Sequence, residues 1–283
     1  MSAKVVSLSE ATACIEDGSH VALGGFAITR NVVAAVHEII RARKRDLTVS
    51  QVIGGMDTDL LVGAGCVRRL IYSGGSLDRF GFLNAVNAAV SSGSLAVQEY
   101  SSLALTLRFH AGAMGLPFVA CRSMLGSDLL AGVASSTDVR VGEDPFTGTP
   151  TALLAPLRPD VAIVHVDTAD ERGNASLSGP TWAIRETALS ARRVIVLCEE
   201  IVPAIPPDLV AIPGSVVQAV VAVPRGAHPT AVVGRYDYDA KHLQEYVRIV
   251  TEAPDGPMAY LDRYVLGVRD HGEYLARAEG DPL

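Results

Sequence analysis

Short apolar runs alternate with amphipathic segments along most of the chain. The apolar runs have the length and β-branched content of buried strands. They lie at Val21–Leu23, Leu47–Ile53, Arg69–Ser73, Leu95–Tyr100, Pro117–Ala120, Val161–Val166, Val194–Glu199 and Val216–Val223. Patterns typical of amphipathic helices occupy residues 31–44, 82–91, 102–114, 182–191 and 239–252. This alternation predicts an open, mainly parallel sheet with helices on both faces, which is a three-layer α/β/α fold.

Two stretches depart from the alternation. Residues 126–151 are rich in Gly, Ser, Thr, Asp and Pro, and this composition predicts a long irregular excursion between two halves of the sheet. Near the carboxyl terminus, Gly256 and Pro257 come before a charged, amphipathic segment. The sequence therefore predicts one domain over residues 1–254 and a helical extension over residues 255–283.

The run Val21–Leu23 ends in a glycine pair followed by an aromatic residue, Gly24-Gly25-Phe26. Adjacent glycines allow positive φ and carry no Cβ, so backbone N–H groups can approach a phosphate, a thioester oxygen or another chain. Loops at the carboxyl ends of parallel strands are the usual ligand sites of α/β folds. A second pair, Gly74-Gly75, follows another predicted strand and is a weaker candidate for lining the same ligand site. Purely structural turns also use glycine pairs, and spacing alone leaves that interpretation open.

Ser101 and Ser102 lie between a predicted strand and a predicted helix. Either hydroxyl could cap the helix, which is the common structural use of serine at this position. A helix N-terminus also offers unpaired N–H donors and the positive end of a dipole, which suit an anion or a developing oxyanion. The pattern is compatible with both roles.

Composition narrows the function classes. A net charge of −7 argues against a nucleic-acid partner, and no apolar stretch approaches the ~20 residues of a membrane-spanning helix. Four scattered cysteines without close spacing indicate neither a metal site nor a disulfide framework. These features predict a cytoplasmic protein with buried thiols.

Several segments resemble the family I coenzyme A transferases. Asp17-Gly18, the apolar run and Gly24-Gly25-Phe26 match the family's first signature, although Arg30 and Val32 stand where that pattern has a glycine and a proline. The run from Glu99 to Phe118 is similar to the glutaconate-type α subunit. Turns at residues 165–175 and 224–230 resemble those of the family, so the likeness covers about residues 5–250.

The resemblance implies site residues and a mechanism. Ser102 falls where succinyl-type transferases carry an oxyanion-stabilising glutamine and a ring-opening hydrolase its catalytic glutamate. The family passes an acyl group from coenzyme A to a glutamate, which forms a mixed anhydride and then a glutamyl thioester. That glutamate belongs to a Ser-Glu-Asn-Gly-like motif of the β half, and this chain has no such motif. Glu199-Glu200 is interpreted as a strand-end acidic pair, and His165 and His228 as turn-fixing hydrogen bonders.

The resemblance therefore implies the α subunit of a heteromeric CoA-transferase. A homologous β subunit would supply the nucleophile in a heterodimer or larger assembly, and CoA would move between an acyl-CoA and a small carboxylic acid. The expected substrate-binding residues are Gly24, Gly25, Phe26, Gly74, Gly75 and Ser101, with Ser102 contacting the reacting group. Coenzyme A is part of the substrate, and no bound cofactor is expected. Two alternatives stay open: an acyl-CoA hydrolase or decarboxylase on the same fold, and a non-catalytic ligand-sensing domain.

Overall fold

The main sheet of the protein is parallel, and its two longest strands lie next to each other. The structure, a computed structural model, describes residues 4–133, 136–253 and 255–280. The strand order is β11 (Val217–Ala222), β10 (Arg193–Val202), β8 (Val161–Asp170), β1 (His20–Leu23), β2 (Leu47–Ser50), β3 (Val67–Tyr72) and β4 (Ala96–Glu99). Neighbours along this order pair in parallel, and the short β9 (Ala175–Ser176) pairs antiparallel with β8. The predicted parallel sheet is confirmed.

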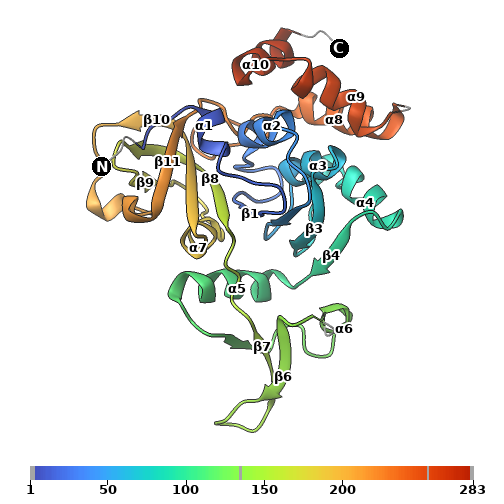
Figure 1. The fold of residues 1–283 in the computed structure, drawn as a ribbon, viewed down its shortest axis with the longest axis vertical. Helices are drawn as coiled ribbons and strands as arrows, with labels where there is room; N and C mark the ends of the chain where they lie inside the picture. Colours follow the sequence, from blue (N-terminus) through green and yellow to red (C-terminus); the bar gives the residue numbers. More distant parts are fainter. Residues whose placement is uncertain (1–3, 134–135, 254, 281–283) are drawn as a thin grey trace.

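Alternation along the strands places a helical layer on each face. On β1, Val21 and Leu23 join one apolar cluster and Ala22 joins another. The first cluster lies under α1 (Leu8–Thr12), α2 (Val33–Arg41), α3 (Met56–Gly63) and α4 (Asn84–Ser91). On the other face lie α5 (Ser102–Met114) and α7 (Ile184–Ser190), as Figure 1 shows. The three-layer α/β/α fold predicted from the sequence is thus confirmed.

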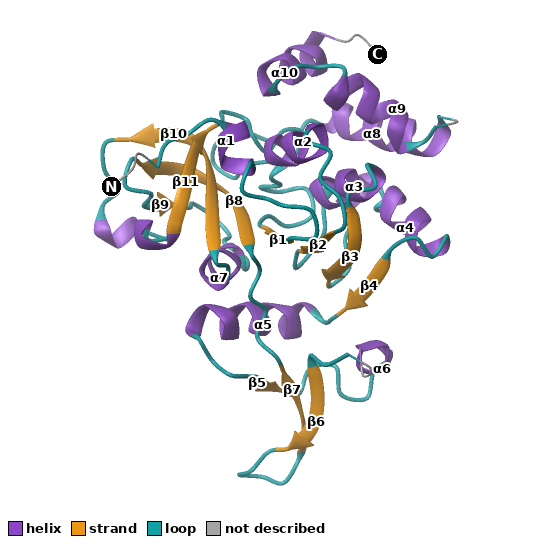
Figure 2. Ribbon diagram, viewed as in Figure 1, coloured by secondary structure: helices purple, strands orange, loops and turns teal. Residues whose placement is uncertain are grey.

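The predicted irregular excursion over residues 126–151 is wrong. Within its described part lie α6 (Asp128–Val133) and β6 (Val139–Glu143), and it ends in β7 (Pro150–Leu154). With β5 (Val119–Cys121) these strands form an antiparallel sheet in the order β5-β7-β6, beyond α5 (Figure 2). The buried Arg108 of α5 donates to Ala155 O at 2.9 Å and lies 3.2 Å from Asp138. The Gly, Ser, Thr, Asp and Pro content of this segment indicated turns, and it concealed two five-residue strands, one within the segment and one that begins at its end.

The sequence analysis did not predict helix α3, for a different reason. Its residues Asp57 and Asp59 are fully buried, so the helix shows no apolar stripe against a polar face. Tyr246 donates to Asp59 Oδ2 at 2.7 Å, and the Val86 N–H donates to Asp59 Oδ1 at 2.9 Å. Burial raises the pKa of Asp59 to about 6, in spite of these hydrogen bonds.

The carboxyl-terminal segment is helical and packs on the outside of α2 and α3. It contains α8 (Ala240–Glu252), α9 (Pro257–Leu261), a π-helical turn (Asp262–Leu266) and α10 (His271–Gly280). Its buried residues Tyr260, Tyr264 and Tyr274 belong to the main apolar cluster. The division of the chain after residue 254 stays a prediction, and residue 254 itself lies outside the described residues.

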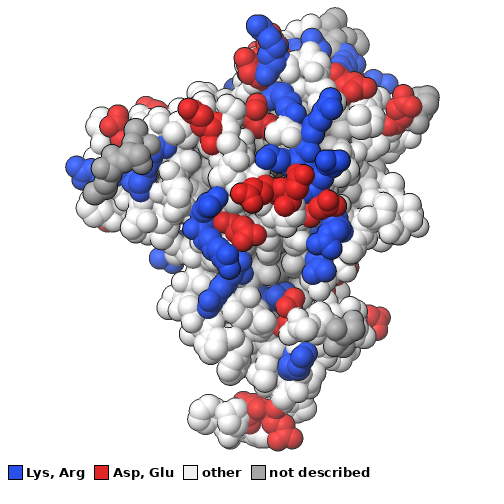
Figure 3. All heavy atoms as spheres, in the orientation of Figure 1, with Lys and Arg blue, Asp and Glu red and all other residues white. Residues whose placement is uncertain are grey.

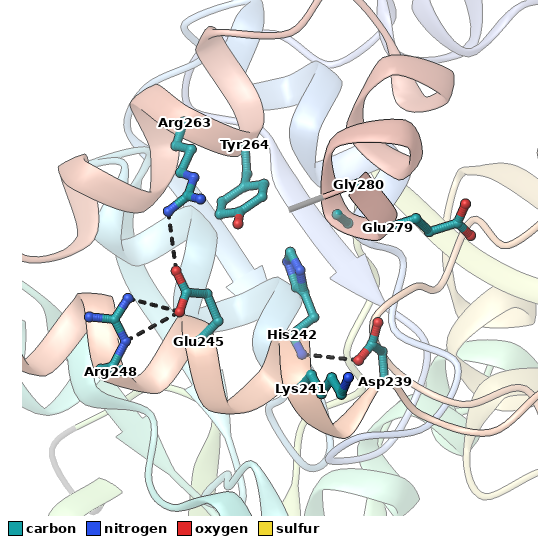
Figure 4. A pocket seen from close by; sticks show the side chains of 10 residues that line it. Asp239, Lys241, His242, Glu245, Arg248, Arg263, Tyr264, Glu279 and Gly280 are labelled. Atoms are coloured by element: carbon teal, nitrogen blue, oxygen red, sulfur yellow. Dashed lines mark hydrogen bonds and ion pairs between the residues drawn. The ribbon is translucent and has the colours of Figure 1, made fainter. Parts of the chain in front are cut away.

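Buried histidines gather where this segment meets the rest of the fold. Tyr274 Oη lies 2.9 Å from His228 Nδ1, and Tyr260 Oη lies 2.7 Å from His242 Nε2. His37 contacts the Tyr274 ring edge-on at 4.7 Å between centroids. A cavity of about 840 Å³ opens beside this cluster, and Figure 4 shows His242 and Glu245 of α8 on its wall. Burial lowers the pKa of His242 to about 3 and that of His37 well below its usual value.

These imidazoles make the fold sensitive to acid. An unfolded histidine has a pKa near 6.5. Below that pH the unfolded chain binds protons that the folded chain does not bind, so the free energy of unfolding falls as the pH is lowered. For His242 the loss is about 2 kcal/mol between pH 7 and pH 5. Asp57 and Asp59, each with a pKa raised to about 6, act in the opposite sense, because the folded chain keeps their protons while the unfolded chain loses them.

We therefore expect His242→Gln to flatten the decline of unfolding free energy between pH 7 and pH 5 by about 2 kcal/mol. Urea unfolding at several pH values measures this. His110→Gln, at an exposed position on α5, is the matched control and should follow the wild-type profile. An unchanged profile in His242→Gln would show that His242 does not stay neutral in the folded protein.

Candidate active site

The loops after β1, β2 and β3 join into one wall at the carboxyl edge of the sheet. The Ala27 N–H donates to Ile53 O at 3.4 Å, and the Gly54 N–H donates to Gly74 O at 3.0 Å. Gly75 pairs with Gly54 in an isolated parallel bridge. Both predicted glycine pairs therefore lie on this wall. Ser101 and Ser102 follow β4, three strand steps or ~14 Å from the β1 loop, in which Gly24 and Gly25 are themselves buried.

The Gly24-Gly25-Phe26 loop has a geometry that needs glycine. Gly25 has a φ of +88°, and a Cβ there would lie 2.6 Å from Arg30 O. The loop closes on itself because Phe26 and Thr29 exchange backbone hydrogen bonds of 2.8 and 2.9 Å. A Cβ on Gly55, in the next loop, would lie 2.1 Å from Ala27 O. A larger residue at Gly25 would therefore distort the β1 loop itself, and one at Gly55 would push the β1 and β2 loops apart.

A buried polar network supports this loop from behind. Gln51 Nε2 donates to Gly24 O at 2.8 Å and to Asp57 Oδ2 at 3.1 Å. The same carboxylate oxygen accepts from the Val32 N–H at 3.1 Å. Burial raises the pKa of Asp57 to about 6, although these bonds favour its charged form. Sequence reasoning missed both residues: Gln51 is a polar residue inside the predicted strand run Leu47–Ile53, and Asp57 follows Gly54-Gly55-Met56 without a distinguishing pattern.

Arg30 explains the departure from the family signature. Its side chain is fully buried, and Nη2 lies 2.8 Å from Asp167 Oδ1 and 2.9 Å from Ser178 O. Arg30 has a φ of +55°, in the left-handed region that a glycine adopts more easily. The ion pair holds this strained residue in place and ties the β1 loop to β8 and to the segment after β9.

An aromatic pair covers part of the same loop. The rings of Phe26 and Trp182 stack with centroids 5.1 Å apart and planes 14° from parallel. Trp182 lies two residues before the start of α7, has a φ of +41° and is half-buried. The sequence analysis did not single out Trp182, although it is the chain's one tryptophan.

The two serines after β4 have different environments. Ser101 is the N-cap of α5, and its Oγ accepts from the Ala104 N–H at 3.1 Å. Ser102 is the first helical residue and is exposed, as is Leu103 beside it. The capping role therefore belongs to Ser101, and Ser102 stands at the open N-terminus of a 13-residue helix.

Two carboxylates at the sheet edge differ in accessibility. Glu199 is nearly buried and accepts from Tyr236 Oη at 2.9 Å and from the Arg225 N–H at 2.7 Å, while His165 Nε2 lies 2.9 Å from it. Burial opposes ionisation, but these contacts outweigh it and lower the pKa of Glu199. Glu99 is exposed at the end of β4, and a Cβ on Gly74 would lie 3.9 Å from its Oε1. Sequence reasoning missed Glu99 as a carboxylate of this edge.

Other site classes find little support among the described residues. No group of three or more His, Cys, Asp or Glu in residues 4–133, 136–253 and 255–280 is arranged to hold a metal ion. Within that same part of the chain, no helix has the length and apolar character to cross a membrane. On the face shown in Figure 3, stripes of basic side chains lie beside clusters of acidic ones.

Comparison with known proteins agrees with this geometry. The family model described as coenzyme A transferase matches residues 5–223. The chain is 38% identical over 97% of its length to an uncharacterized protein of Archaeoglobus fulgidus, of which it spans 62%. It is 37% identical to the A subunit of 3-oxoadipate CoA-transferase from Pseudomonas knackmussii, over 98% of this chain and 99% of that protein.

Two solved structures are similar over nearly the whole chain. Glutaconate coenzyme A-transferase from Acidaminococcus fermentans superposes with a TM-score of 0.92 at 32% identity, covering 97% of this chain and 92% of that one. The decarboxylase AibA/AibB superposes with a TM-score of 0.81 at 33% identity, covering 93% of this chain and 100% of that one. By its matching family model and by relatives of this identity along nearly its full length, the chain belongs to the coenzyme A transferase family.

Proposed function

We propose that this chain is the α subunit of a heteromeric CoA-transferase that moves CoA between an acyl-CoA and a small carboxylic acid. The observation that carries the proposal is the wall of glycine loops at the carboxyl edge, with an open helix N-terminus beside it. The similarity to the A subunits of 3-oxoadipate and glutaconate CoA-transferases supports the reaction. The only bound coenzyme in this proposal is the CoA of the substrate.

We propose that a partner β subunit supplies the nucleophilic glutamate. Glu199 is a poor nucleophile, because three groups already hold its carboxylate in place. The exposed side chains of Phe82 and Leu103, 70% and 58% accessible, flank the edge and would be covered by such a partner. Free cysteines at all four positions support a reducing, cytoplasmic setting.

In this proposal the N-terminus of α5 stabilises charge on the thioester carbonyl oxygen. The first N–H groups of a helix have no intrahelical partners, and its dipole favours negative charge there. Ser102 adds a hydroxyl at this end, while Ser101 is engaged as the cap. The substrate would lie along the wall from Ser102 towards Gly25.

The proposed roles of the two subunits predict which chain carries the covalent intermediate. Mixed with its partner and an acyl-CoA, the enzyme should carry a glutamyl–CoA thioester on the partner chain. Borohydride reduces that thioester to an alcohol and releases CoA, so mass spectrometry of the digested chains locates it. This chain alone should show no thioester and no turnover above about 1 s⁻¹.

Glu99 provides the decisive control for that experiment. Glu99→Gln should leave the partner-borne thioester in place and the rate within about tenfold of wild type, because its carboxylate is not the acyl acceptor. A reduced glutamate found at Glu99 would refute the assignment of the nucleophile to the partner.

The two serines provide a matched pair of variants. Ser102→Ala should preserve thermal unfolding and lower turnover, by up to ~10²–10³ if its hydroxyl is a principal oxyanion donor. Ser101→Ala should instead lower stability by ~0.5–2 kcal/mol, because it removes the cap of α5. Turnover and unfolding are measured on the same heteromeric preparation. Wild-type turnover in Ser102→Ala would show that the Ser102 hydroxyl is not an oxyanion donor, and only backbone N–H groups would then act at this helix end.

A decarboxylase is the second candidate function, favoured by the 33% identity to AibA/AibB. The two reactions differ in their products. A transferase forms a new acyl-CoA only when an acceptor acid is present, whereas a decarboxylase releases CO₂ from an acyl-CoA without any acceptor. Assay of the wild-type heteromer with and without acceptor separates them.

A further inference from the structure

The stacked pair of Phe26 and Trp182 is the aromatic feature nearest the glycine loop. Phe26 directly follows Gly25, and Trp182 lies in the segment between β9 and α7. Both residues are half-buried, so part of each side chain is accessible. Ala183, the next residue, belongs to the same apolar cluster as Ala104 and Leu105 in the first turns of α5.

The backbone on both sides of the stack is strained. Ala27 and Arg30 have φ values of +50° and +55°, and Trp182 has a φ of +41°. Positive φ is uncommon for residues other than glycine, and it is a clear outlier for one as bulky as tryptophan. Such strain persists only where surrounding contacts over-determine it, and it concentrates at functional sites.

Buried contacts hold both strained segments together. Arg30 donates from Nη2 to Asp167 and to Ser178 O, four residues before Trp182. Asp167 Oδ2 also accepts from the Ser178 N–H, and Ser178 Oγ donates to Val233 O at 3.3 Å. The aromatic stack is thus a rigid element that a buried ion pair and several strained residues hold in place.

We propose that the Phe26–Trp182 stack is the apolar wall that contacts the acyl chain of the acyl-CoA and sets its preferred length. This rests on the proposed function for the identity of the substrate. A flat aromatic surface suits an alkyl chain because it removes apolar area from water without needing hydrogen bonds. Trp182 is accordingly a specificity-determining residue that touches substrate away from the reacting carbonyl.

Trp182 is the one tryptophan of this chain, which makes the proposal measurable by fluorescence. The difference in emission between the wild-type heteromer and a heteromer carrying Trp182→Phe isolates this residue from tryptophans of the partner. We expect acetyl-CoA, butyryl-CoA and hexanoyl-CoA to shift this difference progressively, and free CoA to leave it nearly unchanged. An equal response to free CoA and to all three thioesters overturns the proposal.

Kinetics give a second, independent test. Trp182→Gly relieves the positive φ but removes a ring that packs against a core cluster, so kinetics are compared on heteromer whose thermal unfolding is also measured. Its kcat/KM ratio for butyryl-CoA over acetyl-CoA should fall by about tenfold or more, mainly through KM, because each methylene in an apolar site contributes to selectivity. Trp182→Phe should keep the ratio within about threefold of wild type. An equal loss for both donors would overturn the proposal, because it would make Trp182 merely structural.

A control aromatic pair lies elsewhere on the fold. The rings of Phe80 and Tyr238 contact at 5.6 Å and pack against the main apolar cluster under α2 and α3, so Tyr238→Ala should leave the donor ratio unchanged. The two proposals fail separately. A heteromer without transferase activity whose Trp182 emission still follows chain length keeps the acyl wall and rejects the transferase. An active transferase whose Trp182 emission does not change with chain length keeps the transferase and rejects the acyl wall.

Discussion

The buried ion pair between Arg30 and Asp167 is the interaction on which the candidate site depends. It joins the first loop of the sheet to β8, the strand beside β1. A charge buried without a partner is strongly destabilising, so neither residue can be lost alone without cost. The pair therefore fixes the β1 loop against β8, although the two residues are far apart in sequence.

Around this pair, buried polar side chains and glycines, which interrupt the apolar pattern of the sequence, position the backbone of the loops. Gln51 and Asp57 hold the Gly24 carbonyl and the start of α2 from within the fold. Glycines at positions 25 and 55 let the neighbouring backbones approach. These contacts hold the backbone of this edge from within the chain, and we infer from them the preorganisation that electrostatic stabilisation of a reacting carbonyl requires.

Much of the architecture could be predicted from the sequence, because apolar runs of strand length alternate with amphipathic helices. The strands β6 and β7 were missed because they lie in or at the end of a segment rich in Gly, Thr, Asp and Pro, and α3 was missed because its buried aspartates interrupt the apolar stripe. The first glycine loop was identifiable because two adjacent glycines, Gly24 and Gly25, end an apolar run of strand length and so indicate a tight turn. Trp182 and Asp167 could not be assigned to that loop, since only the tertiary fold brings residues about 140 to 160 positions away beside it.

The central claim is that the ion pair positions the loop for reaction, beyond its part in stability. A double-mutant cycle of Arg30→Met and Asp167→Leu, followed by unfolding free energy and kcat/KM of the heteromer, tests this directly. Each single variant should lose about 3–5 kcal/mol of stability, and the double variant should recover much of it, because apolar residues can replace a buried pair. We expect kcat/KM of the stable double variant to stay low. A double variant that regains both stability and wild-type kcat/KM would contradict the claim.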